Sequence, residues 1–213
     1  MEKRIVIPGE LVIEERRRLG DHVYLKDGKI YSDVLGIAET DEQTASVIPL
    51  QGKYMPRAGD LIVGLISRDV YSGYIVDINS FYAAFISKKE LRETLKVGTV
   101  VSAKIEEVNE VNDVDLSNIR VFYGGEILSV SPVKVPRMIG KNGSMLEVLK
   151  KGTACNLLIG RNGRIWIKGG NYDLLVKAIA KIEAEAHLSN LTNKITQYLE
   201  EENAKEKETK EAK

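Results

Sequence analysis

The feature that most constrains the fold is a glycine pair set between two short segments of apolar periodicity, within residues 135–149. Pro136 can open the first segment as a helix, because the first helical N–H has no intrahelical partner. Gly140 and Gly143 enclose a Lys-Asn pair, and without Cβ atoms they permit positive φ and the close approach of another backbone. A second helix is expected to begin near Ser144. A bare loop between two helix ends can hold a sugar-phosphate backbone, because the start of the second helix supplies free N–H donors and a positive terminus.

A lone Gly-x-x-Gly pattern is also typical of a simple tight turn, so the surrounding elements decide between the two interpretations. An alternating, strand-like segment at residues 126–133 precedes the loop. Two more strand-like segments follow, at residues 155–159 and 164–168, joined by a turn with an Asn-Gly pair that favours a hairpin. A long amphipathic helix is expected from about Tyr172. This β-α-α-β-β-α order is that of a eukaryotic-type KH domain, a module that clamps about four nucleotides.

Charge is unevenly distributed along the chain, although its total is zero, with 31 Lys and Arg against 31 Asp and Glu. Residues 131–188, which include the Gly-Lys-Asn-Gly loop, carry ten basic and four acidic side chains, and the rest of the chain is slightly acidic. A local basic surface can attract a polyanion even on a neutral protein. The distribution therefore supports a nucleic-acid partner for this segment.

Short alternating strands and an Asp-Gly hairpin signal predict a small all-β domain over residues 1–56. The charge run at residues 14–18 can be a solvated loop or a contact with a partner. Residues 57–125 predict a five-stranded barrel of the OB type, in which Gly64 suits a sharp bend within a strand.

OB barrels bind single strands by stacking bases on exposed aromatic rings beside basic side chains. About half of the aromatic candidates in this barrel are equally well explained as core residues. The candidates are Tyr71, Phe81, Tyr82, Arg68 and Lys88.

The length of 213 residues has room for two or three small domains, so we expect an α+β multidomain chain with the KH domain at residues 126–199. Its single cysteine, Cys155, excludes an internal disulfide, and it shares no zinc-ligand spacing with His22 or His187. We expect no cofactor, no metal, no secretory signal, no membrane-spanning segment and a cytoplasmic location. Residues 200–213 are nearly all charged or small. Pairs at i,i+4 could extend the last helix into this segment, but nothing apolar anchors it, so we expect a disordered tail there.

Three blocks of sequence, taken in order, are more specific than these general patterns. The first block joins Val-Ile-Pro-Gly-Glu-Leu at residues 6–11 to Asp-Gly-Lys-Ile-Tyr-Ser at residues 27–32. The second block joins residues 49–60, which contain Pro-Leu, Gly, Tyr, Pro and Gly-Asp at fixed spacing, to Val-Asp-Ile at residues 76–78.

The third block runs from residues 131–145, around the Gly-Lys-Asn-Gly loop, to Gly-Arg-Asn-Gly-Arg-Ile-Trp-Ile at residues 160–167 and Glu-Ala-His at residues 185–187. Over roughly residues 4–199, the three blocks resemble the archaeal exosome RNA-binding cap subunits, which join an N-terminal β domain, a ribosomal-S-one-type OB fold and a KH domain. One departure is Tyr74, which stands where this family would carry tryptophan.

The resemblance implies a set of partners and a function. Three cap subunits, alone or mixed with a zinc-ribbon cap protein, would sit on a hexameric ring of RNase-PH-type subunits that carry the phosphorolytic active sites. The N-terminal domain would dock on the ring, the OB folds would line the entry pore and the KH domains would lie at the periphery. The cap would bind single-stranded RNA and guide 3′ ends into the ring for 3′-to-5′ degradation, without catalytic residues of its own.

The residue patterns and the family motif together suggest eleven RNA-binding residues. They are Arg137, Gly140, Lys141, Asn142, Gly143, Ser144, Lys150, Arg161, Arg68, Tyr71 and Tyr82.

Two other functions fit parts of the sequence. Polynucleotide phosphorylase, a nuclease, also carries KH and OB modules, but in the opposite order, and its ring-forming catalytic domains are missing from this sequence. The other alternative is a purely structural clamp whose KH fold serves packing alone. RNA binding by an isolated fragment of residues 131–199 would distinguish that clamp from an RNA-binding subunit.

Overall fold

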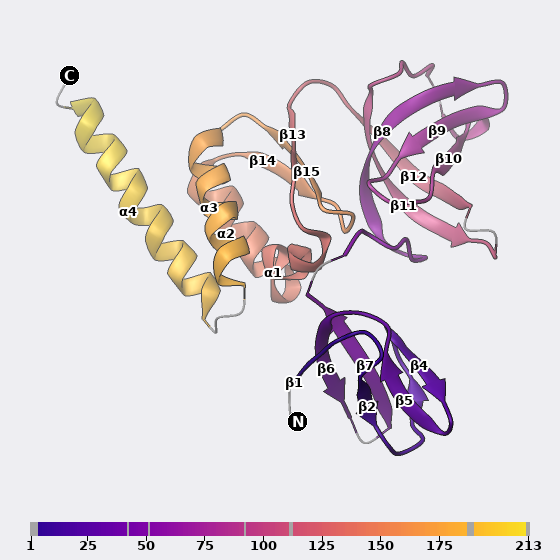
Figure 1. Ribbon diagram of the computed structural model, residues 1–213. Coiled ribbons are helices and arrows are strands. Elements are labelled where there is room, and N and C mark those ends of the chain that lie inside the picture. Colours follow the sequence, from indigo (N-terminus) through magenta and orange to yellow (C-terminus); the bar gives the residue numbers. More distant parts are fainter. Residues whose placement is uncertain are drawn as a thin grey trace. The chain divides into compact units, whose positions relative to one another are not determined.

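The computed structural model describes residues 4–41, 43–50, 52–91, 93–110, 113–186 and 190–211 (Figure 1). The chain divides into two units, Met1–Gly52 and Lys53–Lys213. Tyr54 is buried in the core of the barrel that follows, so residues 53–56, which we expected in the first domain, pack with the second unit. None of the described helices is long and apolar enough to cross a membrane.

The first unit is all β, as predicted, and consists of short strands in two small sheets. The sheets have the strand orders β1-β6-β7-β3 and β2-β5-β4. Val6, Val12, Ile30 and Val47 are the larger residues of its small core. The strands are β1 (Arg4–Val6), β2 (Leu11–Ile13), β3 (Arg18–Leu19), β4 (Val23–Lys26), β5 (Lys29–Ser32), β6 (Gly36–Thr40) and β7 (Thr44–Pro49).

Five strands of the second unit close into a barrel with the order β10-β12-β11-β8-β9. The pairing of β10 with β12 is parallel, and the other pairings are antiparallel. Gly64 lies on β8 where a Cβ would come within 2.4 Å of a methyl carbon of Val76, so the glycine permits close strand packing. The elements are β8 (Leu61–Val70), β9 (Gly73–Asp77), β10 (Ala84–Ser87), a 3-10 turn (Lys88–Glu90), β11 (Val100–Val108) and β12 (Val114–Phe122).

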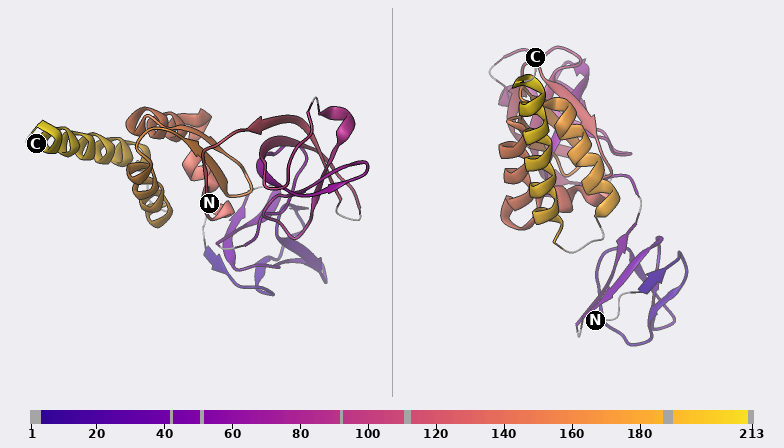
Figure 2. Two further views of the ribbon diagram at one scale, coloured as in Figure 1. Left: turned by 90° about the horizontal axis from the view of Figure 1, so that it is seen from above. Right: turned by 90° about the vertical axis from the view of Figure 1, so that its left-hand side faces the viewer.

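The KH fold predicted from the element order is confirmed. Its sheet has the antiparallel order β13-β15-β14, and the helices pack against the core beside it (Figure 2). The Asn171 side chain caps the third helix by accepting a hydrogen bond from the backbone N–H of Leu174. The elements are β13 (Glu126–Ser129), a 3-10 turn (Pro132–Lys134), α1 (Val135–Ile139), a 3-10 turn (Lys141–Gly143), α2 (Ser144–Thr153), β14 (Asn156–Ile159), β15 (Arg164–Lys168) and α3 (Tyr172–Glu185).

A further helix, α4 (Leu191–Glu211), packs against α2 and α3, so our expectation of a disordered tail is wrong for residues 200–211 (Figure 1). Leu191, Ile195 and Leu199 bury one side of α4 in the KH core. Asn203 extends this contact, because its amide donates a 2.7 Å hydrogen bond to the carbonyl oxygen of Gly152 near the end of α2. The prediction of disorder was based on the charged residues after position 199. It did not take into account the apolar residues Leu191, Ile195 and Leu199, which lie in the first half of the same helix.

Candidate nucleic-acid interface

The loop between α1 and α2 has a backbone that requires glycine. Gly140 has φ 74° and ψ 175°, Asn142 has φ 53° and Gly143 has φ 80°. A Cβ on Gly140 would lie 2.7 Å from the backbone nitrogen of Met145, so a larger residue there would displace the first turn of α2. Asparagine tolerates the left-handed region better than most residues. The local sequence thus places two residues without a Cβ, Gly140 and Gly143, just before the start of α2.

Four predicted side chains are exposed around this loop: Arg137, Lys141, Asn142 and Ser144. The start of α2 also provides the positive end of a helix dipole, which favours a phosphate group. Lys150 does not join the group, since a residue six positions after Ser144 lies about 9 Å further along the helix and about 240° around it. The structure therefore places Lys141, Asn142 and Ser144 in the loop and at the start of α2, with Arg137 on the preceding helix α1 and Lys150 further along α2.

The barrel candidates occupy different environments. Tyr71 is fully exposed in the turn between β8 and β9, and Arg68 is exposed on β8 just before that turn. Tyr82 is half-buried and packs against the barrel core, in agreement with the core alternative. Lys88 is engaged in an ion pair, with its Nζ 2.6 Å from Asp69 Oδ1.

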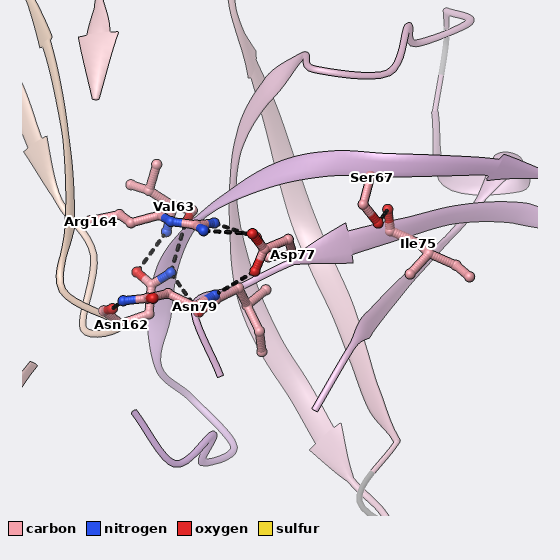
Figure 3. A network of polar contacts seen from close by, with 8 residues as sticks. Val63, Ser67, Ile75, Asp77, Asn79, Asn162 and Arg164 are labelled. Carbon is pink, nitrogen blue, oxygen red and sulfur yellow. Dashed lines mark hydrogen bonds and ion pairs between the residues drawn. The ribbon is translucent and has the colours of Figure 1, made fainter. Parts of the chain in front are cut away.

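The second glycine-bracketed turn, Gly160 to Gly163, joins β14 to β15 as the predicted hairpin and packs against the barrel (Figure 3). Asn162 is fully buried. Its Oδ1 accepts a 3.1 Å hydrogen bond from Val63 N, and its Nδ2 donates to Val63 O at 2.7 Å and to Ile78 O at 2.9 Å. A Cβ on Gly160 would lie 2.6 Å from Val63 N. This turn is consequently a tight contact between the KH domain and the barrel.

An ion pair reinforces that contact. Arg164 donates from Nη1 to Asp77 O and from Nη2 to Asp77 Oδ2, both at 2.6 Å (Figure 3). Asn79 bridges the same two elements, because its backbone N–H donates to Asp77 Oδ1 and its Nδ2 donates to Asn162 O, both at 2.9 Å. Partial burial by itself raises the pKa of the Asp77 carboxyl, but the hydrogen bonds from Arg164 and Asn79 outweigh it and hold the pKa below its usual range.

Arg161 is the residue of this turn predicted to contact RNA. Its backbone N–H donates a 2.8 Å hydrogen bond to Leu61 O, which fixes its main chain against β8. Its guanidinium Nε lies 4.0 Å from Asp60 Oδ1, and about half of the side chain is exposed. Arg161 therefore retains a solvent-facing side chain whose charge is partly compensated.

The segment connecting barrel and KH domain is fixed as well. Trp166 on β15 stacks on Phe122 at the end of β12, with ring centroids 4.2 Å apart, and its Nε1 donates a 2.9 Å hydrogen bond to Gly124 O. Lys168 Nζ donates to Tyr123 O at 3.0 Å. With the buried turn, these contacts explain why barrel and KH domain form one compact unit.

Sequence analysis singled out the segments that hold Asp77, Asn162 and Arg164 but missed their contact. An Asn-Gly pair between strands is fully explained by turn chemistry, so nothing local pointed to burial of Asn162. One signal for a different role of Asn162 was available in the sequence. The pattern Gly-basic-Asn-Gly occurs twice, at residues 140–143 and 160–163, whereas a KH domain needs only one phosphate-binding loop.

An exposed Gly-x-x-Gly loop on a KH fold, joined to an OB-type barrel by buried polar side chains, defines a multidomain protein of the nucleic-acid-binding class. Comparisons with known proteins narrow that class. The sequence profile of the KH domain matches residues 125–173, and the profile of the exosome RNA binding protein RRP4 N-terminal domain matches residues 3–51.

Curated relatives match along nearly the whole chain. Exosome complex component Rrp4 of Methanosarcina barkeri is 42% identical over 100% of this chain and 88% of its own length. The Rrp4 protein of Pyrococcus furiosus is 34% identical over 92% of this chain and 83% of its own length. The chain therefore belongs to the Rrp4 family of exosome complex components.

A solved structure is also similar. It is a crystal structure assigned as an exosome complex RNA-binding protein, with a TM-score of 0.63 and 34% identity, and the match covers 72% of this chain and 98% of that one.

Proposed function

We propose that this protein is a non-catalytic RNA-binding cap subunit of an archaeal exosome, working in the cytoplasm. It binds single-stranded RNA and guides 3′ ends into an RNase-PH-type ring for 3′-to-5′ degradation. The observation that carries this proposal is the exposed loop from Gly140 to Gly143, where a bare backbone, a helix N-terminus and Lys141 meet. The names of the full-length relatives support assembly with other exosome subunits.

In the proposed complex, the sugar-phosphate backbone crosses the loop from Gly140 to Gly143, where no Cβ at either glycine obstructs it. Lys141 neutralises one phosphate, and Arg137 and Ser144 flank the same helix end. Each phosphate that a lysine neutralises on a single strand releases condensed counterions, so the affinity depends on salt. The remaining proposed contacts are Lys150 and Arg161 in the KH domain and Arg68, Tyr71 and Tyr82 on the barrel.

The loop can be tested by the double substitution K141D/N142D. Its natural control is N193D/K194D, which makes the same two changes at an exposed Asn-Lys pair on α4. We expect the free energy of unfolding of K141D/N142D to stay within about 0.5 kcal/mol of the parent, because both positions are exposed. The control can lose somewhat more stability, because Lys194 Nζ lies 3.8 Å from Glu185 Oε2 and K194D replaces this ion pair by two neighbouring carboxylates. RNA titrations at several salt concentrations should show weaker binding for K141D/N142D alone, with the slope of log affinity against log salt reduced by roughly 0.7. Equal affinity of both variants and the parent would rule out the loop as an RNA clamp.

The first unit carries a surface suited to docking on the ring. Strand register aligns Ile5 with Ile37 and Ile37 with Ile48 across β1, β6 and β7, on the side of the sheet opposite Val6 and Val47 of the core. Ile5 is 64% exposed and Ile48 44% exposed. An aligned apolar row on a folded sheet marks an interaction surface. We assign it to the RNase-PH-type ring, with three cap subunits per ring, alone or mixed with the zinc-ribbon cap protein.

A single charge placed in this row tests the assignment. I48E should abolish co-elution with the assembled ring in size-exclusion chromatography, because it buries a carboxylate against an apolar partner. L25E is the matched control, since Leu25 is 41% exposed on the β4–β5 hairpin outside the row. Normal ring binding by I48E, or equal loss in both variants, would contradict docking through this face.

A further inference from the structure

Two tyrosine rings stack on the outer face of the β2-β5-β4 sheet of the first unit (Figure 1). Register pairs Tyr24 on β4 with Tyr31 on β5, and their ring centroids are 5.8 Å apart with an angle of 24° between the planes. Ile30, next to Tyr31 in sequence, is fully buried, so the alternation of side chains along a strand turns both rings away from the core. Tyr24 is 40% exposed. The pair therefore presents an aromatic surface to solvent.

Two lysines extend this face towards the hairpin turn. Lys26 and Lys29 pair in register across the two strands, each two residues from a tyrosine, so their side chains leave the same face of the sheet. Lys26 is exposed. Lys29 Nζ lies 2.8 Å from Glu14 Oε1, which compensates the charge of Lys29. The aromatic rings, rather than net charge, are consequently the dominant feature of this face.

The tyrosine face and the apolar row assigned to ring docking lie on opposite sides of the first unit. Both small sheets contribute to one core, with Val47 from one sheet and Ile30 from the other. Sheets that pack through their inner faces direct their outer faces away from each other. A partner docked on the apolar row therefore leaves the two tyrosines accessible.

The size of the face favours a narrow ligand over a protein. The strands β2, β4 and β5 have three or four residues each. With strands about 4.8 Å apart and a rise of about 3.4 Å per residue, they cover roughly 200 Å². A stable protein interface needs about 800 Å² on each side. A nucleotide base needs only one open aromatic face, and the sheets of RRM modules stack two or three bases on exposed aromatic rings.

We propose that the outer face of the β2-β5-β4 sheet is an additional RNA-binding surface, on which bases of a single strand stack against Tyr24 and Tyr31 while Lys26 contacts a phosphate. This surface rests on the proposed RNA-binding function and extends it to the first unit, which otherwise serves docking alone. Strand register and mutual stacking already fix the two rings, so a base that stacks on them costs little side-chain entropy.

The test uses the full chain and a single-stranded RNA of about twenty nucleotides, long enough for more than one contact region. Y24T/Y31T removes both rings but keeps β-branched residues that favour a strand, and the control Y24F/Y31F keeps both rings. We expect about tenfold weaker binding for Y24T/Y31T, since one lost base–aromatic stack lowers affinity roughly 5- to 150-fold, and parent-like binding for Y24F/Y31F. K26A should reduce the slope of log affinity against log salt by roughly 0.7, whereas Y24T/Y31T should leave that slope unchanged.

Photocrosslinking to the parent chain adds a measurement that does not depend on the stability of a variant. It is needed because a cross-strand aromatic pair also stabilises its own sheet, so Y24T/Y31T can lower the melting temperature of the first unit. RNA that carries 4-thiouridine should crosslink to the peptides that contain Tyr24 and Tyr31. Mass spectrometry of the digested complex identifies these peptides.

The outcomes separate this surface from the wider function. A parent chain that binds no RNA would overturn the RNA-binding function and this surface with it. RNA binding that K141D/N142D weakens and Y24T/Y31T does not, without crosslinks to either tyrosine peptide, would overturn this surface alone. Unchanged RNA affinity of Y24T/Y31T together with lost co-elution with the ring would assign the face to a protein contact instead.

Discussion

Two tetrapeptides of almost the same sequence have opposite environments in the KH domain. Gly-Lys-Asn-Gly at residues 140–143 is an exposed loop, whereas Gly-Arg-Asn-Gly at residues 160–163 is a hairpin turn packed against the barrel. Asn142 has a left-handed backbone and an exposed side chain, and Asn162 is fully buried with three hydrogen bonds to the barrel. The difference shows that the elements flanking a short motif, rather than its letters, decide whether it is available to a ligand.

The largest expected effect comes from removing the buried side chain of Asn162, compared with removing that of Asn142. N162A leaves the N–H and C=O of Val63 and the carbonyl of Ile78 without their partner in a buried site, so we expect the free energy of unfolding to fall by about 2–4 kcal/mol. N142G removes the matching side chain and keeps a residue that accepts positive φ, so its effect should stay below about 0.5 kcal/mol. Urea denaturation of both variants measures the comparison, and equal stabilities would contradict it.

An intermediate effect is expected from the ion pair beside Asn162. R164M keeps the length of the side chain but removes both hydrogen bonds to Asp77, and we expect a loss of about 1.5 kcal/mol near neutral pH. Because the folded pKa of Asp77 is lowered, its contribution is present above the unfolded value, near pH 4, and is lost as pH falls through the folded value. The parent should therefore lose stability relative to R164M below about pH 4. Parallel stability curves across that range would show that Asp77 is not coupled to Arg164.

The smallest effect concerns the basic residue of each tetrapeptide. K141A should reduce the slope of log RNA affinity against log salt by roughly 0.7. R161A should reduce it by less, because the Arg161 guanidinium lies near the Asp60 carboxylate and its charge is partly compensated. Titrations of a single-stranded RNA at four or more salt concentrations give both slopes. A larger change for R161A would reverse the roles that we assign to the two turns in RNA binding.

Much of the fold could be predicted from local sequence. The Gly-Lys-Asn-Gly loop, the Asn-Gly hairpin and the period of the following helix were each recognisable within a few residues, and together they specified the KH domain. The five-stranded barrel followed in the same way from short apolar runs and the mid-strand Gly64.

Contacts between distant residues could not be predicted in this way. Asn162 and Val63 are 99 positions apart, and the sequence around either residue does not indicate a contact with the other. Tyr54 and Ser80, which form a parallel β-bridge, are likewise 26 positions apart. Disorder was preferred to a helix for the end of the chain because no apolar anchor is visible within residues 200–213. In the structure, Leu199 and Asn203 contact α2, which lies outside that charged segment.

The chain contains a single tryptophan, Trp166, and the structure places it where barrel and KH domain meet. Its indole stacks on Phe122 and donates to Gly124 O, so its ultraviolet emission responds to the polarity and order of that junction. Intrinsic fluorescence is therefore a built-in optical reporter that needs no attached dye. It follows opening between the last barrel strand and the KH sheet, and the first 52 residues contribute no indole signal of their own.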